Sequence, residues 1–263
     1  MLLCADTESQ RETTVIPIHT AANIAAMREA GRLVAQTFAA ITPMIEPGIT
    51  TAEIDAAAER FIRAHGAKPA YKGYNGFPAT LCISPNHVIC HGIPGPEQLR
   101  TGDIVGIDVG VILNGWYGDA CITVPVGPIS ADAQRLLDVA AAALEHGIAA
   151  AVVGNHVGDI GAAIQQYVEP FGYGIVREYT GHGVGRALHQ APTIYHVGQP
   201  KTGPKLQEGM IFTIEPMINQ GTHKTLLDKK DHWTVRTADG KLSAQFEHSV
   251  AISADGPILL TLP

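Results

Sequence analysis

Four segments of the chain carry apolar residues at the three- and four-residue spacing of an amphipathic helix. The first begins after Thr20, a residue type that caps helices, and ends before Pro43. The second opens with a capping box at residues 50–53. The third begins after Ser130, and the fourth spans residues 157–168. The pattern therefore predicts two pairs of helices, one in each half of the chain.

Short runs rich in β-branched residues predict the strands between and after these helices. The expected strands cover residues 81–83, 103–113, 116–124, 175–179, 210–217, 233–236, 244–253 and 257–261. Helices mixed with mainly antiparallel strands indicate an α/β (α+β) fold.

The two halves align at an offset of 106 residues, as between Gly48 and Gly154 or Ile54 and Ile160. This match favours an internal duplication with a shared sheet, a pseudo-twofold axis and a site between the halves. We expect a flexible N-terminal arm at 1–19 and a single domain at 20–263, with repeat halves at about 20–127 and 128–263.

The central hairpin carries two acids in strands that are otherwise apolar. Asn114-Gly115 is the strongest short signal for a two-residue hairpin turn. That turn places Asp119 opposite Gly110 and puts Asp108 on the same face, on a diagonal. Two carboxylates on one buried face repel each other unless a cation lies between them. The alternatives are acids exposed near a turn, or an acid paired with an arginine.

Two more acids, Glu215 and Glu247, lie in apolar strands, and His182 lies in a glycine-rich segment that follows a strand. The chain has only 18 Lys plus Arg, and the nearest to these strands in sequence are Arg186 and Arg236. Charge balance therefore favours metal over salt bridges. Four carboxylates and an imidazole exceed what one zinc ion binds and suit two divalent ions.

Composition narrows the class of protein further. A net charge of −7 argues against direct nucleic-acid binding. Four cysteines without a CxxC motif indicate a reducing compartment, and the N-terminus lacks the pattern of a secretory leader. The most apolar stretch, 139–153, is too short to span a bilayer. We therefore expect a cytoplasmic protein without a membrane partner.

Seven motifs together resemble the type I methionine aminopeptidases over about residues 20–261. The matching motifs are Cys-Ile-Ser-x-Asn-x-Val-x-Cys-His-Gly-Ile-Pro at 82–94, Asp-Ile-Val-x-Ile-Asp at 103–108, Gly-Asp at 118–119, Gly-His-Gly-Val-Gly-Arg at 181–186, Phe-Thr-Ile-Glu-Pro-Met at 212–217, Trp-Thr-Val at 233–235 and Ser-Ala-Gln-Phe-Glu-His at 243–248. The resemblance implies the pita-bread fold and removal of the initiator methionine from nascent chains with a small second residue. Without a Cys/His zinc-binding extension before the domain, the chain resembles the short bacterial form.

The resemblance also implies roles for individual residues. The implied metal ligands are Asp108, Asp119, His182, Glu215 and Glu247, with Asp108 and Glu247 as the bridging pair. The implied catalytic residues are His91, His189 and the proton acceptor Glu215. The implied methionine pocket is formed by Tyr74, Phe77, Cys82, His91 and Trp233, beside His189. A monovalent-cation site for Na or K would involve Asn86, Val88 and Ser249.

Some positions depart from the family pattern. Gln190-Ala191 precedes Pro192 where the family usually has an acid, Leu188 replaces an aromatic residue, and Asn75 replaces a histidine. These departures concern pocket shape and relative rates and leave the metal centre intact.

Several properties follow from the resemblance or stay open. The two divalent ions could be Co, Mn, Fe or Zn, because oxygen-rich ligation with one imidazole suits each of them. The expected partners are N-termini of nascent polypeptides and the ribosome, and we expect a monomer. Two alternatives remain: a proline-specific (Xaa-Pro) metallopeptidase of the same fold, and a non-catalytic binding relative.

Overall fold

The computed structural model describes residues 15–263 and contains the four expected helices. They are α1 (Ala21–Ile41), α2 (Thr51–Ala64), α3 (Ala131–Ala150) and α4 (Val157–Val168), with short 3₁₀ turns at Thr42–Met44, Tyr74–Gly76 and Glu169–Phe171. The Thr20 side chain accepts a hydrogen bond from the backbone N–H of Asn23, and Thr50 with Glu53 forms the expected capping box. The helix predictions are therefore confirmed, including their N-terminal caps.

The helix pairs of the two halves match in local geometry. The amide of Thr50 donates to the Glu53 carboxylate at 2.8 Å, and the amide of His156 donates to that of Asp159 at 2.6 Å. Gly48 and Gly154 both have positive φ, at 99° and 96°. These corresponding bonds occur at the offset by which the sequence aligns with itself.

The strands form four small sheets that are antiparallel throughout. The strands are β1 (Lys68–Pro69), β2 (Leu81–Pro85), β3 (Val88–Cys90), β4 (Ile104–Leu113), β5 (Trp116–Pro125), β6 (Gly174–Ile175), β7 (Gly181–Gly183), β8 (Gln190–Ile194), β9 (Ile211–Ile214), β10 (Met217–Asn219), β11 (Thr225–Leu227), β12 (Val235–Thr237), β13 (Ser243–Gln245), β14 (His248–Ser253) and β15 (Gly256–Leu259). The sheet orders are β1-β4-β2 with β5 paired to β4, β15-β14-β9-β7-β8, β13-β10-β6 and β11-β12-β3.

The β4–β5 hairpin has the expected register. Asn114 and Gly115 form the turn with φ of 51° and 76°, Leu113 pairs with Trp116, and Gly110 pairs with Asp119. The sequence therefore predicted which residue faces Asp119 across the ladder.

Two predicted strands are each split at their acid, which corrects the sequence prediction. The segment 210–217 divides into β9 and β10 at Glu215-Pro216, and 244–253 divides into β13 and β14 at residues 246–247. At each break the chain passes from the three-stranded to the five-stranded sheet, or the reverse. Pro216 has no N–H to donate to a ladder, and the Glu247 amide donates instead to the Cys121 carbonyl at 2.8 Å.

The other strand predictions hold with changed ends. Segment 175–179 is strand only in β6, which ends at Ile175, and segment 233–236 is strand from Val235. The amides of Trp233 and Thr234 donate to the Asp231 side chain at 2.8 and 2.9 Å rather than to a neighbouring strand. Local side-chain bonds thus replace the ladder there.

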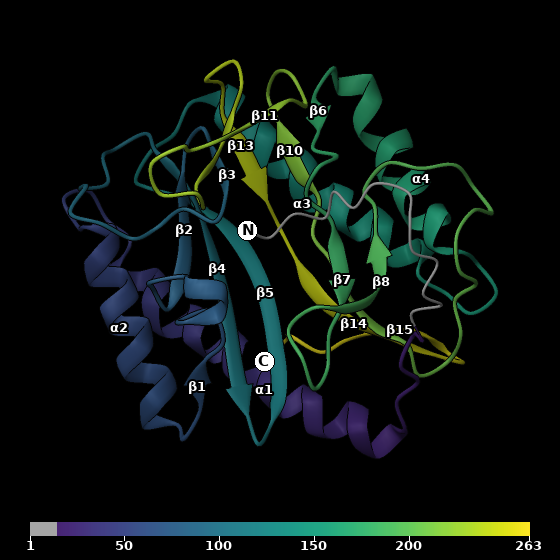
Figure 1. Cartoon of the computed structure of the whole chain (residues 1–263). Helices are drawn as coiled ribbons and strands as arrows, with labels where there is room; N and C mark the ends of the chain where they lie inside the picture. The colour runs from purple at the N-terminus through teal and green to yellow at the C-terminus, as the bar shows by residue number, and fades with distance from the viewer. Residues whose placement is uncertain (1–14) are drawn as a thin grey trace.

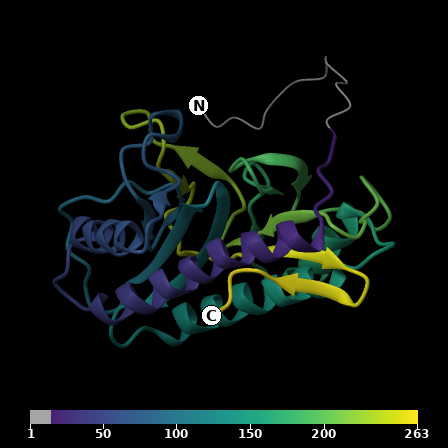
Figure 2. The ribbon, with the colours of Figure 1, turned by 90° about the horizontal axis from the view of Figure 1, so that it is seen from below.

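Each half has its own core between helices and strands. The first joins α1 and α2 to β2, β4 and β5, and the second joins α3 and α4 to β9 and β14. Figure 1 shows the strands in front of α1 and α3, and Figure 2, turned by 90°, shows both helices along one side of the strands. The opposite side of the sheets is therefore not covered by these two helices. Across residues 15–263, no helix combines the length and hydropathy that a membrane span requires.

The expected N-terminal arm is described only in part, because residues 1–14 lie outside the described residues. Residues 15–19 lead into α1, and the amide of His19 donates to the Gly209 carbonyl at 2.7 Å. Ile16 is half-buried and packs against the second core. These residues thus contact the C-terminal half of the chain.

Candidate metal centre

Every residue that the sequence proposed as catalytic, metal-binding or methionine-binding lines one cavity of about 750 Å³. Asp108 lies on β4, Asp119 on β5 and His182 on β7, whereas Glu215 and Glu247 lie at the two strand breaks. Both halves of the chain therefore contribute to the same cavity. The breaks let the chain leave the ladder at the acid, so that its carboxylate can face the cavity.

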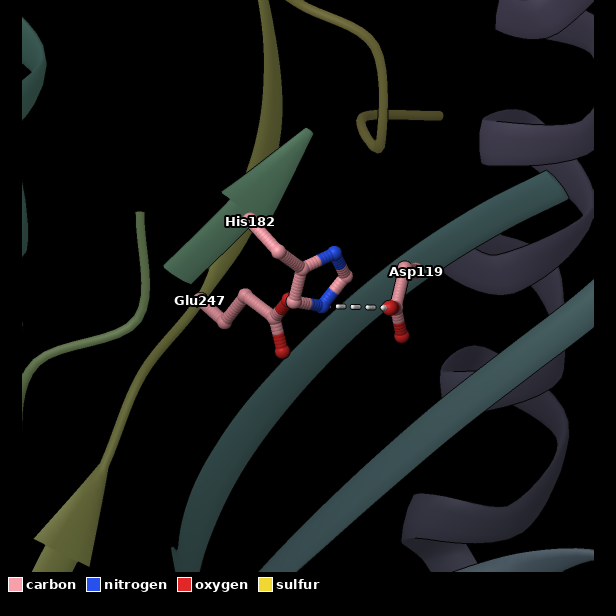
Figure 3. Close-up of side chains that lie close together, drawn as sticks. All are labelled: Asp119, His182 and Glu247. Carbon is pink, nitrogen blue, oxygen red and sulfur yellow. Dashed lines mark ion pairs between the residues drawn. The ribbon is translucent and has the colours of Figure 1, made fainter. Parts of the chain in front are cut away.

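Three of the five proposed metal ligands converge most closely. Ligand atoms of Asp119, His182 and Glu247 all lie within 4.8 Å of one another. Figure 3 shows these three side chains close together. Nε2 of His182 lies 3.6 Å from Oδ2 of Asp119 and 3.6 Å from Oε1 of Glu215. Asp108, which the resemblance implied as a bridging ligand with Glu247, is outside this group.

The contacts of His182 leave a gap suited to a cation. Burial lowers the pKa of His182 to about 3, with a smaller contribution from His189, so the ring is neutral at pH 7. Its Nδ1 lies 3.1 Å from the Gly183 carbonyl, which makes Nδ1 the donor and leaves a lone pair on Nε2. A separation of 3.6 Å is too long for a hydrogen bond. Two ligands on one tetrahedral zinc lie about 3.4 Å apart.

Asp119, Glu215 and Glu247 are buried and Asp108 is partly buried, and none of the four has a Lys or Arg partner in the described part of the chain. Burial raises the pKa of Asp119 to about 7, and burial together with neighbouring acids raises the pKa values of Asp108, Glu215 and Glu247. Within residues 15–263, the ion pairs include no Lys or Arg for any of these four acids. The sequence alternative of arginine pairing is therefore wrong: Arg236 binds Asp228 at 2.6 Å and Arg186 lies over the Trp116 ring. The donor set fits divalent metal ions.

Glu215 is fixed on three sides. Oγ1 of Thr213 donates to Oε1 at 2.7 Å, and Nε2 of Gln245 donates to Oε2 at 3.3 Å. The backbone amide of Glu215 donates to Nε2 of the buried His196 at 3.2 Å. These bonds orient both the carboxylate and the backbone at the strand break.

The two outer histidines are also neutral. Burial lowers the pKa values of His91 and His189 to about 4. The Tyr74 hydroxyl lies 2.8 Å from Nδ1 of His189, and the rings of His189 and His182 are 4.2 Å apart. If Tyr74 donates this bond, Nε2 of His189 carries the proton that can be donated to a bound peptide.

An aromatic cluster forms the apolar end of the cavity. Phe77 and Trp233 meet edge to face with centroids 5.1 Å apart, and Trp233 also approaches His91. Cys82 and Leu188 belong to the same cluster, and burial raises the pKa of the Cys82 thiol. This end is apolar and polarisable, as a thioether side chain requires.

The sequence prediction missed several cavity residues. Tyr71, Tyr179, Met217 and Ile16 line the cavity, and His196 supports it from behind. The usable signal for Tyr71 was Gly110, because a glycine opposite a buried acid leaves room for a large neighbouring side chain. No spacing pattern pointed to the others.

The residues proposed for a monovalent cation do not line this cavity. The Ser249 hydroxyl donates to the Asp119 carbonyl at 2.7 Å. The Asn86 carbonyl accepts instead from the amide of Ser243 at 2.8 Å, and the Ser243 hydroxyl is buried without a hydrogen-bond partner among the described residues. Ser243 is therefore the serine whose backbone contacts Asn86.

Comparison with known proteins identifies the family to which this chain belongs. The model of metallopeptidase family M24 matches residues 25–254. The chain belongs to metallopeptidase family M24. This member is 50% identical to methionine aminopeptidase 1 of Bacillus subtilis (strain 168) over 237 residues, which cover 89% of this chain and 94% of that protein.

Solved structures confirm the expected pita-bread fold for this M24 member. The crystal structure of methionine aminopeptidase from Rickettsia prowazekii has a TM-score of 0.93 and 48% identity, covering 94% of this chain and 100% of that one. The prolidase from Pyrococcus furiosus has a TM-score of 0.77 at 24% identity, and 65% of it is covered. The prolidase likeness shows the fold alone. The resemblance to methionine aminopeptidases is therefore confirmed.

Proposed function

We propose that this M24 member is a methionyl aminopeptidase that removes the N-terminal initiator methionine from nascent polypeptides with a small second residue. The observation that carries the proposal is the position of four acids without Lys or Arg partners among the described residues, and of His182, in the same cavity as an apolar aromatic pocket. The high identity to methionine aminopeptidases over almost the whole chain supports the same activity.

We infer that Asp108, Asp119, His182, Glu215 and Glu247 hold two divalent metal ions, which would be Co, Mn, Fe or Zn. Bound metal would lower the pKa of a water toward neutrality and polarise the scissile carbonyl. We assign Asp119, rather than Asp108, as the carboxylate that would hold metal together with Glu247, because ligand atoms of Asp119, His182 and Glu247 lie within 4.8 Å of one another. Glu215 accepts the proton of the attacking water, and Thr213 and Gln245 keep its carboxylate in place.

The outer histidines act on the substrate. His91 and His189 are neutral at pH 7 and line the cavity, His91 near Trp233 and His189 near His182. Each can donate an N–H to the scissile amide or to the charge that develops on its carbonyl oxygen. Tyr74 holds His189 in the tautomer that donates.

The methionine side chain lies in the pocket formed by Tyr74, Phe77, Cys82, His91 and Trp233. Burial of a thioether against aromatic rings and a thiol is favourable, whereas a charged first residue would remain unpaired there. A bulky second residue would clash with the rim of the site, which restricts cleavage to small second residues.

The remaining assignments belong to the same proposal. The enzyme acts in the cytoplasm, as a monomer, on N-termini of nascent chains that leave the ribosome, and it binds neither nucleic acid directly nor membranes. A Na or K ion is held by backbone carbonyls near Asn86 and Val88, with Ser243 in place of Ser249. The buried, unpartnered Ser243 hydroxyl supports this exchange.

A tripeptide assay tests the activity against its rivals. Protein stripped of metal and reloaded with Mn²⁺ or Co²⁺ should cleave Met-Ala-Ser and leave Met-Leu-Ser and an Xaa-Pro peptide intact. Cleavage of Xaa-Pro alone would establish a proline-specific peptidase, and no cleavage by metal-loaded protein would favour a non-catalytic relative.

A matched pair of variants tests the assigned site. Asp119→Asn should abolish cleavage and reduce bound metal, because it removes a negative ligand from the centre. Glu145→Gln, an exposed acid on α3, makes the same chemical change and should leave both unchanged. Full cleavage by Asp119→Asn would contradict the assignment.

A further inference from the structure

Tyr71 contacts two of the proposed metal ligands directly. Its hydroxyl lies between Oδ1 of Asp108 and Oδ1 of Asp119 and shares its single donor proton between the two carboxylates. The residue lies in the loop between β1 and the 3₁₀ turn at Tyr74–Gly76 and is only 8% exposed, so water does not compete for these bonds. No other side chain of the described residues makes a hydrogen bond to both acids.

Packing around the Tyr71 ring fixes the position of its hydroxyl. A Cβ added at Gly110 would lie 2.4 Å from Cε1 of Tyr71, so the glycine opposite Asp119 provides the space that the ring fills. The amide of Ala70 donates to the Gly110 carbonyl at 2.9 Å, which fixes the neighbouring backbone. The ring also packs in the apolar cluster that contains Phe77 and Cys82. The hydroxyl is therefore held at the carboxylates by packing that does not depend on metal.

The bonds leave one oxygen of Asp119 for the centre. Tyr71 binds Oδ1 of Asp119, whereas Oδ2 faces Nε2 of His182 at 3.6 Å. A carboxylate with one oxygen bound by a protein donor has a fixed orientation, and its other oxygen is presented to a ligand. The same hydroxyl also lies between two acids that would otherwise face each other without a donor.

We propose that Tyr71 is a positioning residue of the metal centre, whose hydroxyl holds Asp108 and Asp119 so that their free oxygens face the ions. The inference rests on the proposed function for the existence of the centre. The role is separate from the methionine pocket, although the ring of Tyr71 forms part of the same wall.

The test compares two tyrosine-to-phenylalanine variants that each remove one hydroxyl from the cavity. Tyr71→Phe removes the contact with the two acids. Tyr179→Phe is the control, because Tyr179 lines the same cavity but makes no hydrogen bond to Asp108 or Asp119. Mn²⁺ affinity is measured by calorimetry on chelator-treated protein, without any substrate.

Tyr71→Phe should weaken Mn²⁺ affinity about 10-fold or more, the usual effect of removing a group that orients a metal ligand. The Mn²⁺ affinity of Tyr179→Phe should stay within about 2-fold of that of the unsubstituted protein, because Tyr179 orients no proposed ligand. Thermal unfolding gives a second readout, since weaker binding reduces the rise in Tm that saturating Mn²⁺ produces. A purely structural role of the hydroxyl would lower Tm equally with and without metal.

Unchanged or tighter Mn²⁺ affinity in Tyr71→Phe, or an unchanged metal-induced rise in Tm, would overturn the inference. Failure of the unsubstituted protein to bind Mn²⁺ would instead contradict the proposed function. The two failures are therefore distinguished by the same experiment.

Discussion

The backbone amide of Glu215 donates its hydrogen bond to Nε2 of His196, 3.2 Å away. Glu215 lies between β9 and β10, where Pro216 prevents a continuous ladder, so this amide has no partner strand. His196 is 1% exposed and provides the acceptor that the strand break removed. An imidazole thus stabilises the backbone at the point where a proposed metal ligand leaves the sheet.

Two replacements of His196 should separate the effect of its hydrogen-bond acceptor on stability from the effect of its ring volume. His196→Leu leaves the Glu215 amide buried without an acceptor, which costs about 1–3 kcal/mol of unfolding free energy. His196→Gln keeps an acceptor oxygen at similar reach and should lose less. The measurement is urea unfolding of the metal-free protein. Equal losses in the two variants would mean that the hydrogen bond contributes nothing.

His91 gives a pH dependence with a defined sign. Burial, with a smaller effect of His189, lowers the pKa of His91 to about 4 from 6.5. The unfolded chain therefore binds one more proton than the folded protein between pH 6.5 and 4. Stability from this group is complete above pH 6.5 and is lost as pH falls, by about 1.4 kcal/mol per pH unit.

His91→Asn removes this titration and suits the left-handed backbone at that position, where φ is 55°. Unfolding free energies from urea titrations at pH 7 and pH 5 should therefore fall less for the variant than for the unsubstituted metal-free protein. Parallel losses would show that His91 protonates in the folded state near its ordinary pKa.

Gly110→Ala tests the packing that places Tyr71. The added methyl group would lie 2.4 Å from the Tyr71 ring, so the ring or the strand must shift. Overpacking of this kind costs about 1–3 kcal/mol. Gly106→Ala on the same strand is the control, since its nearest contacts are at 3.5 Å. Equal thermal stability of the two variants would contradict the close contact.

His189→Ala should reduce kcat for Met-Ala-Ser while leaving metal bound. The His189 ring contacts the His182 ring, but His189 is not one of the five proposed metal ligands. Its Nδ1 is hydrogen-bonded to the Tyr74 hydroxyl. Loss of a donor to a developing charge costs about 10²–10³-fold in kcat. Bound metal is measured on the same sample, and its loss would show that His189 acts as a ligand.

The sequence predicted most of the fold because its signals are local. Caps at Thr20 and Thr50 located the helices, and Asn114-Gly115 set the register that places Asp119 opposite Gly110. The strand breaks at Glu215 and Glu247 escaped prediction, since the bonds of their amides to His196 and Cys121 join residues distant in sequence.

In the candidate site, too, local motifs were predictable and contacts between distant residues were not. Family motifs located the proposed catalytic, metal-binding and methionine-binding residues, whereas Tyr71 was missed because its contact with Gly110 joins residues distant in sequence. The contact of the Ser243 amide with the Asn86 carbonyl joins residues distant in sequence, so the spacing of motifs did not point to Ser243. The spacing of the acids in the sequence likewise did not indicate that Asp119 lies close to Glu247, because this proximity depends on the folded chain.

The most direct measurement is an anomalous difference map from a crystal soaked with Mn²⁺. The account predicts two peaks within bonding distance of the five proposed ligands, one of them contacting Asp119, His182 and Glu247. The absence of any peak beside those three residues, at Mn²⁺ concentrations that support cleavage of Met-Ala-Ser, would contradict it.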